Sequence, residues 1–119
     1  MRFMILVKAT KESEAGALPE DVVRALGKYH EDLLKAGVLL AADGLDPSAK
    51  GARMTYSGEK RVLTHGPFAE ARGIVAGYTM IQVRSRDEAL EWFRRFPNPH
   101  PGHECEIELR QVSSSPNSR

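Results

Sequence analysis

The sequence has one cysteine, few aromatic residues, no long apolar run and almost no net charge. Cys105 is alone and cannot form an internal disulfide, so we expect a reducing, cytoplasmic location. The longest N-terminal apolar run, Phe3 to Val7, is too short for a membrane span or a signal-peptide core. Seventeen Lys and Arg against sixteen Asp and Glu leave a net charge of +1, without the positive field of a nucleic-acid binder. We therefore expect no nucleic-acid or membrane partner.

What is present is typical of one globular domain. The 119 residues are 41% hydrophobic and 28% charged, which is ordinary usage for a folded protein of this size. We expect a single domain over residues 1–112. The polar residues 113–119 are predicted to form a disordered tail.

Hydrophobic periodicity predicts a sheet, a hairpin and two amphipathic helices. The first helix follows Pro19 and ends at Gly37, with the capping preferences of those two residues. The predicted strands are 2–9, 38–42, 77–83 and 105–112, the hairpin arms are 52–57 and 60–65, and the helices are 19–36 and 85–96. Thr10–Leu18 is predicted to be a polar connection, and Asp43–Pro47 a turn. The stripe expected to be buried on the first helix contains Val22, Val23, Leu26, Tyr29, Leu33 and Leu34.

This order of elements predicts an α+β fold of the ferredoxin-like, split βαβ type with an extra hairpin and both helices on one face. The opposite face would then carry Met4 and Leu6 beside Glu106, Glu108 and Arg110. A half-apolar face is seldom left in water, so we expect a homodimer stacked sheet against sheet around a partly polar cavity, a dimeric α/β barrel. The alternative is an ordinary solvated face.

Several segments resemble one family. The run Val62–Arg72, followed by Gly77-Tyr78, resembles the signature of the DGPFAETKE family, which lies within the broader YCII-related group. Asp87–Trp92 and Glu108–Val112 match later parts of that pattern. The sequence departs from it at His65, where the family has Asp, and at 71–73, where Ala-Arg-Gly replaces Thr-Lys-Glu.

The resemblance implies a dimeric α+β barrel for which no reaction is established. Members are often encoded beside or fused to extracytoplasmic-function sigma factors, which implies a possible sigma-factor link. The wider YCII-related group has a proposed His–Asp pair in a cleft at the dimer interface, which suggests an enzyme.

The candidate acid–base pair is His30 with Asp43. His30 falls within the apolar stripe of the first helix, where a histidine is more often a hydrogen-bonded core residue than a catalyst. If Asp43 came within hydrogen-bond reach, it would orient the imidazole and raise its pKa. We therefore expect catalysis if the two share a cleft, and none if the sheet separates them.

A second candidate is the break after the hairpin. His65 is the third candidate catalytic residue, and Glu70 and Arg72 are candidate ligand-binding residues beside it. The alternative is a structural corner, because Gly66 and Pro67 are residue types that a tight turn needs. On the last strand, Glu108 and Arg110 are expected either to bind a ligand or to form an ion pair.

The sequence does not support a metal site. His100, His103 and Cys105 are zinc-ligating residue types, but the two histidines straddle Pro101-Gly102 in an irregular loop and Cys105 is expected to be buried. We expect no metal and no cofactor.

Three functional hypotheses follow. The first is a homodimer whose interface cleft binds a small molecule and carries His/carboxylate acid–base chemistry. The second is a non-enzymatic regulatory module that binds a protein partner such as a sigma factor. The third is a purely structural dimerisation domain.

Overall fold

The computed structural model describes residues 1–16, 18–71 and 73–113. Arg72 and the predicted tail beyond residue 113 lie outside the described residues. The elements are β1 (Arg2–Lys8), α1 (Lys11–Ala15), α2 (Glu20–Lys35), β2 (Leu39–Gly44), the short 3-10 helix η1 (Ser48–Lys50), β3 (Ala52–Ser57), β4 (Lys60–His65), β5 (Val75–Gln82), α3 (Arg86–Arg94) and β6 (Ile107–Gln111).

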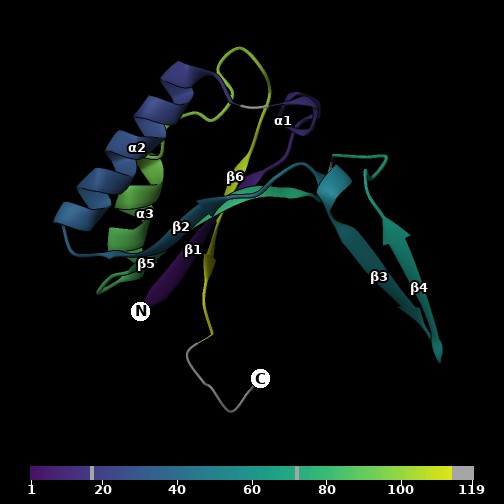
Figure 1. Ribbon diagram of the computed structural model, residues 1–119. Helices are drawn as coiled ribbons and strands as arrows, with labels where there is room; N and C mark the ends of the chain where they lie inside the picture. Colours follow the sequence, from purple (N-terminus) through teal and green to yellow (C-terminus); the bar gives the residue numbers. More distant parts are fainter. Residues whose placement is uncertain (17, 72, 114–119) are drawn as a thin grey trace.

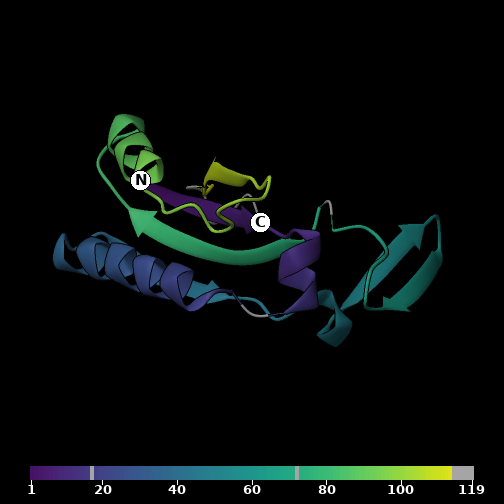
Figure 2. The same cartoon turned by 90° about the horizontal axis from the view of Figure 1, so that it is seen from above.

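Four of the strands form one antiparallel sheet in the order β2-β5-β1-β6. Helices α2 and α3 lie side by side over the same face of this sheet (Figures 1 and 2). The predicted α+β fold, with an extra hairpin and both predicted helices on one face of the sheet, is confirmed, and the dimeric barrel stays a prediction. The central place of β1 explains why that strand is apolar on both faces: one row packs under the helices and the other lies on the open face.

The core lies between the helices and the sheet. Phe3 and Ile5 of β1 and Ile81 of β5 pack against side chains of α2, α3 and the loops that flank them. The buried stripe of α2 is narrower than expected, because Val23 and Leu34 are 52% and 65% exposed. These two positions lie about 100° around the helix from buried neighbours, and the sheet covers only one side of α2.

Lys11–Ala15 form helix α1 where the sequence analysis predicted an irregular connection. Thr10 begins α1 with a reciprocal cap: its Oγ1 accepts from the Ser13 amide at 3.0 Å, and the Thr10 amide donates to Ser13 Oγ at 2.8 Å. The polar residues that suggested a loop are therefore the ones that cap this helix. One turn later, the Glu14 carboxylate accepts from the amide and the hydroxyl of Ser48.

Strand β2 extends further than predicted, and this changes the place of one candidate residue. Asp43 and Gly44 pair with Tyr78 and Gly77 of β5 instead of forming a turn. A strand ladder thus overrides the local turn preference of Asp-Gly. At the other end of the chain Cys105 is half-buried and precedes β6.

The hairpin β3–β4 has the predicted bounds and lies away from the main sheet. It forms a separate two-stranded sheet that extends from the body as an arm (Figures 1 and 2). All twelve of its strand residues are exposed. No helix in the described part of the chain is long and apolar enough to cross a membrane.

Candidate functional site

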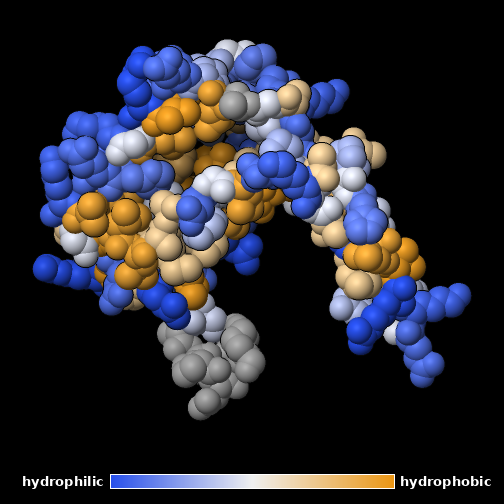
Figure 3. Space-filling view, in the orientation of Figure 1, coloured by the Kyte–Doolittle hydropathy of each residue, from blue (hydrophilic) through white to orange (hydrophobic). Residues whose placement is uncertain are grey.

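A cleft of about 640 Å³ opens between α2, one end of the sheet and the loops around it. Its wall is mostly apolar, and Figure 3 shows apolar side chains around a hollow beside α2. The cleft lies within one chain, on the helix-covered face. The cavity expected between the sheets of two copies stays a prediction. The polar side chains in the wall include those of Lys8, Ser13, His30, Asp43, Asp46, Tyr78, Thr79 and His100.

His30 of α2 borders this cleft and contacts β5 through its ring. Its Nε2 lies 2.7 Å from the hydroxyl of Thr79 on β5. The Thr79 hydroxyl can donate to Nε2 or accept from it, according to the tautomer of the neutral ring. Burial lowers the pKa of His30, and the contact with Leu26 opposes this only in part. Burial therefore favours the neutral imidazole, whose Nε2 lies against a hydroxyl.

Asp43 does not pair with His30. Its carboxylate accepts from the Tyr78 hydroxyl at 3.1 Å. Side chains of successive residues on β5 alternate between faces, so Tyr78 lies on the open face and Thr79, with His30, on the helix-covered face. Asp43 lies at the rim of the cleft, and the hydrogen bonds of the two candidate residues go to other partners, Thr79 for His30 and Tyr78 for Asp43.

The candidates after the hairpin lie elsewhere. His65 ends β4 and is exposed, and Glu70 is exposed in the connection that follows. Neither borders the cleft. Arg72 lies outside the described residues. The corner itself is closely packed, because a Cβ at Gly66 would lie 1.7 Å from the Ser48 carbonyl oxygen.

Glu108 and Arg110 form an ion pair on the open face of the sheet, at 3.1 Å between Nη1 and Oε2. Lys8 lies 3.5 Å from the same carboxylate. The hydrogen bond from Arg110, and then the charge of Lys8, lower the pKa of Glu108. Of the two roles expected for Glu108 and Arg110, the structure contains the ion pair.

His100 lines the cleft, although its sequence position suggested only a weak candidate metal ligand. His100 is 9% exposed and borders the cleft, yet its Nε2 has no hydrogen-bond partner among the described residues. Sequence patterns show the residue type but not its burial, because the loop 97–103 has no periodicity. Among the described residues, no group of three or more His, Cys, Asp or Glu side chains is placed to hold a metal ion.

Comparison with known proteins places this fold in a family. A model of the YCII-related domain matches residues 1–113. The chain belongs to the YCII-related family. An uncharacterised protein of Rhizobium meliloti (strain 1021) is 32% identical to this YCII-related protein over 82 residues, which cover 69% of this chain and 66% of the relative. The chain thus spans about two thirds of that relative. The family resemblance noted from the sequence is confirmed, and neither comparison names a reaction or a ligand.

Proposed function

We propose that this YCII-related protein binds a small, largely apolar molecule in the cleft under α2 and exchanges a proton with it through Thr79 and His30. The observation that carries the proposal is the 2.7 Å contact between Thr79 Oγ1 and His30 Nε2 in the cleft wall. A neutral histidine within hydrogen-bond distance of a hydroxyl has the arrangement that a general base requires.

The proton transfer balances without a further reactant. The ligand gives a proton from a weakly acidic O–H or C–H to Thr79 Oγ1, while the Thr79 proton passes to His30 Nε2. The products are the ligand anion and an imidazolium, and the reverse step returns the proton at the same or another ligand atom. The lowered pKa of His30 keeps the starting imidazole unprotonated at neutral pH.

The size and polarity of the cleft support a small-molecule ligand. Its volume of about 640 Å³ lies within the range of roughly 300–1,000 Å³ that is usual for ligand pockets. Apolar side chains such as Leu18, Leu26 and Phe96 cover much of the wall, with a few polar groups between them. This pattern favours a compact molecule with an apolar body.

The test uses acetophenone, which has an aromatic body and weakly acidic C–H groups. Amide NMR shifts of Thr79 and Leu26 report binding, and proton NMR in D₂O reports exchange of the methyl protons. We expect saturable shifts and an exchange rate at least tenfold above that of Thr79→Val, with Thr79→Ser retaining most of the rate. Binding without any exchange above the buffer rate would overturn the acid–base part, and absence of binding at millimolar acetophenone would overturn the whole proposal.

The protein acts as a homodimer in this proposal, and the hairpin supports that part. Residues that pair across β3 and β4 share a face. One face therefore carries Met54, Tyr56 and Leu63, which are 45%, 64% and 53% exposed, with Arg61 placed over the Tyr56 ring. An isolated two-stranded hairpin is marginal in water unless its apolar face is covered. Figure 3 shows the arm separated from the body of the molecule by an open gap.

A second copy of this chain is the occupant we propose for that face. Strands of six residues are about 20 Å long, so one hairpin face offers a few hundred Å². Stable interfaces bury roughly 800 Å² per partner, so the half-buried Met4, Leu6 and Met80 of the open sheet face would have to contribute as well. In a two-fold symmetric dimer, each copy contributes both its hairpin face and its open sheet face to the interface.

Sedimentation equilibrium tests the dimer. We expect twice the 13.2 kDa chain mass for the natural protein and for Thr55→Glu, which changes the other face of β3. Met54→Glu places a charge on the apolar face and should shift the equilibrium to the monomer by at least tenfold. A natural protein that is monomeric at high concentration would overturn the dimer. That outcome would favour the second candidate function, a module that binds a different protein through the exposed apolar face of the hairpin.

A further inference from the structure

Helix α1 carries a further inference, which rests on the proposed small-molecule cleft. We infer that α1 is a lid over one end of the cleft, which polar contacts hold closed and which opens to let the ligand enter and leave. Ser13 of α1 and Gly16 just after it both border the cleft. Figures 1 and 2 show α1 at the end of the sheet from which the hairpin extends.

One contact fastens α1 to the segment that leads into η1. Residues 45–47 of that segment form part of the cleft wall. The Glu14 carboxylate accepts from the Ser48 amide at 2.9 Å and from the Ser48 hydroxyl. Ser48 is buried, and hydrogen bonds to a carboxylate are among the stronger ones in proteins. This contact is therefore the main fastening of the lid.

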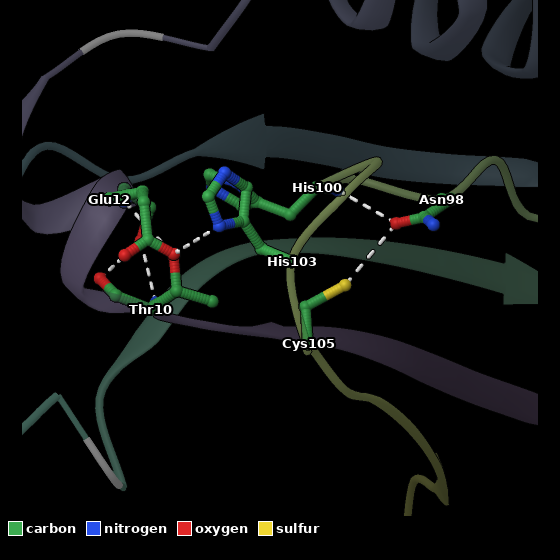
Figure 4. Close-up of polar contacts among 7 residues, drawn as sticks. Thr10, Glu12, Asn98, His100, His103 and Cys105 are labelled. Atoms are coloured by element: carbon green, nitrogen blue, oxygen red, sulfur yellow. Dashed lines mark hydrogen bonds and ion pairs between the residues drawn. The ribbon is translucent and has the colours of Figure 1, made fainter.

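A second contact fastens α1 to the loop 97–103 on another part of the wall, where Pro99 and His100 border the cleft. Figure 4 shows Glu12 of α1 beside the His103 ring of this loop, with 3.3 Å between His103 Nδ1 and a carboxylate oxygen. Both side chains are about half exposed, so this contact is the weaker of the two. Helix α1 thus joins two segments of the wall that are far apart in the sequence.

No buried side chain anchors α1. All five residues of this helix are exposed or half-buried, and so short a helix is marginal in water by itself. The reciprocal cap of Thr10 and Ser13 closes the first turn without attaching it to the body. Among the described residues, the contacts of Glu12 and Glu14 are the side-chain bonds that tie α1 to other elements. Segments held in this way open more readily than a packed core does.

The chain on either side of α1 is fixed, which makes the helix a unit that can swing. The ladder of the sheet reaches Ala9, whose amide donates to the Ile74 carbonyl at 2.8 Å. After α1, a Cβ added at Gly16 would meet no atom within 4 Å, so the backbone has room to turn there. Helix α2 then begins at Glu20. Breaking the two contacts therefore releases α1 without disturbing the sheet or α2.

Amide hydrogen exchange tests the lid without a ligand. The Ser13 amide, which donates to Thr10 Oγ1, should exchange at least 100-fold faster than the amides of β1 in the natural protein. Glu14→Ala removes the main fastening and should raise the Ser13 rate at least tenfold further. Lys11→Ala, at an exposed position of the same helix, is the matched control and should stay within threefold. A Ser13 amide as well protected as those of β1 would overturn the lid.

Acetophenone provides a second test, with association and dissociation rates taken from the NMR line shapes of the Thr79 amide during a titration. A lid changes both rates together, so Glu14→Ala should raise both at least tenfold and leave the dissociation constant within threefold. Lys11→Ala should change neither rate by more than threefold. Glu14→Gln keeps an oxygen that can accept from the Ser48 amide, so its rates should lie closer to those of the natural protein than to those of Glu14→Ala.

The outcomes separate the lid from the proposed function. Weaker binding in Glu14→Ala with an unchanged association rate would make Glu14 a structural residue of the wall and would overturn the lid, while the cleft would stand. If acetophenone does not bind, the proposed function fails, and the exchange rate of the Ser13 amide alone decides whether α1 opens.

Discussion

Replacing Gly66 with alanine should detach the base of the hairpin from the body. An added Cβ would lie 1.7 Å from the Ser48 carbonyl oxygen and 2.5 Å from its carbon. Both are backbone atoms, so no side-chain rotation relieves the clash, and Ser48 must move by roughly 1.5 Å or more to reach ordinary contact distance. The Glu14 carboxylate is held by the Ser48 amide at 2.9 Å, and the Phe68 amide donates to Ser48 Oγ at 3.0 Å. A displacement of that size breaks both hydrogen bonds.

The expected loss is about 3–5 kcal/mol of local stability, since each broken buried hydrogen bond costs about 1–3 kcal/mol and one of them involves a carboxylate. Amide hydrogen exchange measures it directly. The Ser48 and Phe68 amides should exchange at least 100-fold faster in Gly66→Ala, while amides of β1 change little, because β1 pairs with β5 and β6 in a separate sheet from the hairpin.

Gly51→Ala is the matched control. A Cβ at Gly51 faces the same Ser48 carbonyl oxygen at 3.5 Å, an ordinary contact, and the backbone at Gly51 has φ −114° and ψ −176°, which any residue adopts. We expect Gly51→Ala to leave the protection of Ser48 and Phe68 within about threefold of the natural protein, a few tenths of a kcal/mol. If the two alanine variants showed the same protection, the close approach of Gly66 to Ser48 would not be what holds the hairpin.

Three further predictions concern the core and the cleft. Burial lowers the pKa of His30 below its ordinary 6.5, so at lower pH the unfolded chain binds more protons than the folded chain, and the free energy of unfolding falls as the pH drops below 6.5. His30→Gln should flatten this dependence in urea titrations at pH 4.5–7.5. Burial raises the pKa of Tyr29 above its ordinary 10.0, so the contribution of Tyr29 to stability is present below pH 10 and is lost as the pH rises above it. Tyr29→Phe should remove this loss at high pH, and should lower the free energy of unfolding by about 1–2 kcal/mol at pH 7, because the Trp92 carbonyl loses a 2.6 Å hydrogen bond. Ile81→Ala, at a fully buried position, should lower the free energy of unfolding by about 3–5 kcal/mol with an unchanged urea m-value.

Strong periodicity made most of the fold predictable. The alternation in β1 and the one-sided α2 indicated a sheet covered on one face by helices, and Ser57-Gly58-Glu59 placed the hairpin turn within its observed bounds. The errors fall where local and tertiary preferences compete. Thr10 and Ser13 form a reciprocal helix cap in what looked like a loop, and Asp43-Gly44 continues β2 because β5 offers a pairing edge.

The candidate site was predictable only in part, because sequence spacing carries no distance between elements. His30 was singled out as a residue of the apolar side of α2, with Asp43 as its candidate partner. The strand register places Thr79 under α2 and turns Asp43 toward Tyr78 on the other face. His100 lies in a loop without periodicity, where no pattern separates a buried side chain from a solvated one.

The sequence by itself determined the family, the order of the elements and the face of each strand that enters the core, because these depend on residue types at short, regular spacings. The tertiary structure alone decided that His30 contacts Thr79, that His100 Nε2 is buried with no hydrogen-bond partner among the described residues, and that the hairpin leaves the body with its apolar face exposed. These features depend on contacts between segments far apart in the chain. Such contacts follow from strand register and loop packing, which no local pattern encodes.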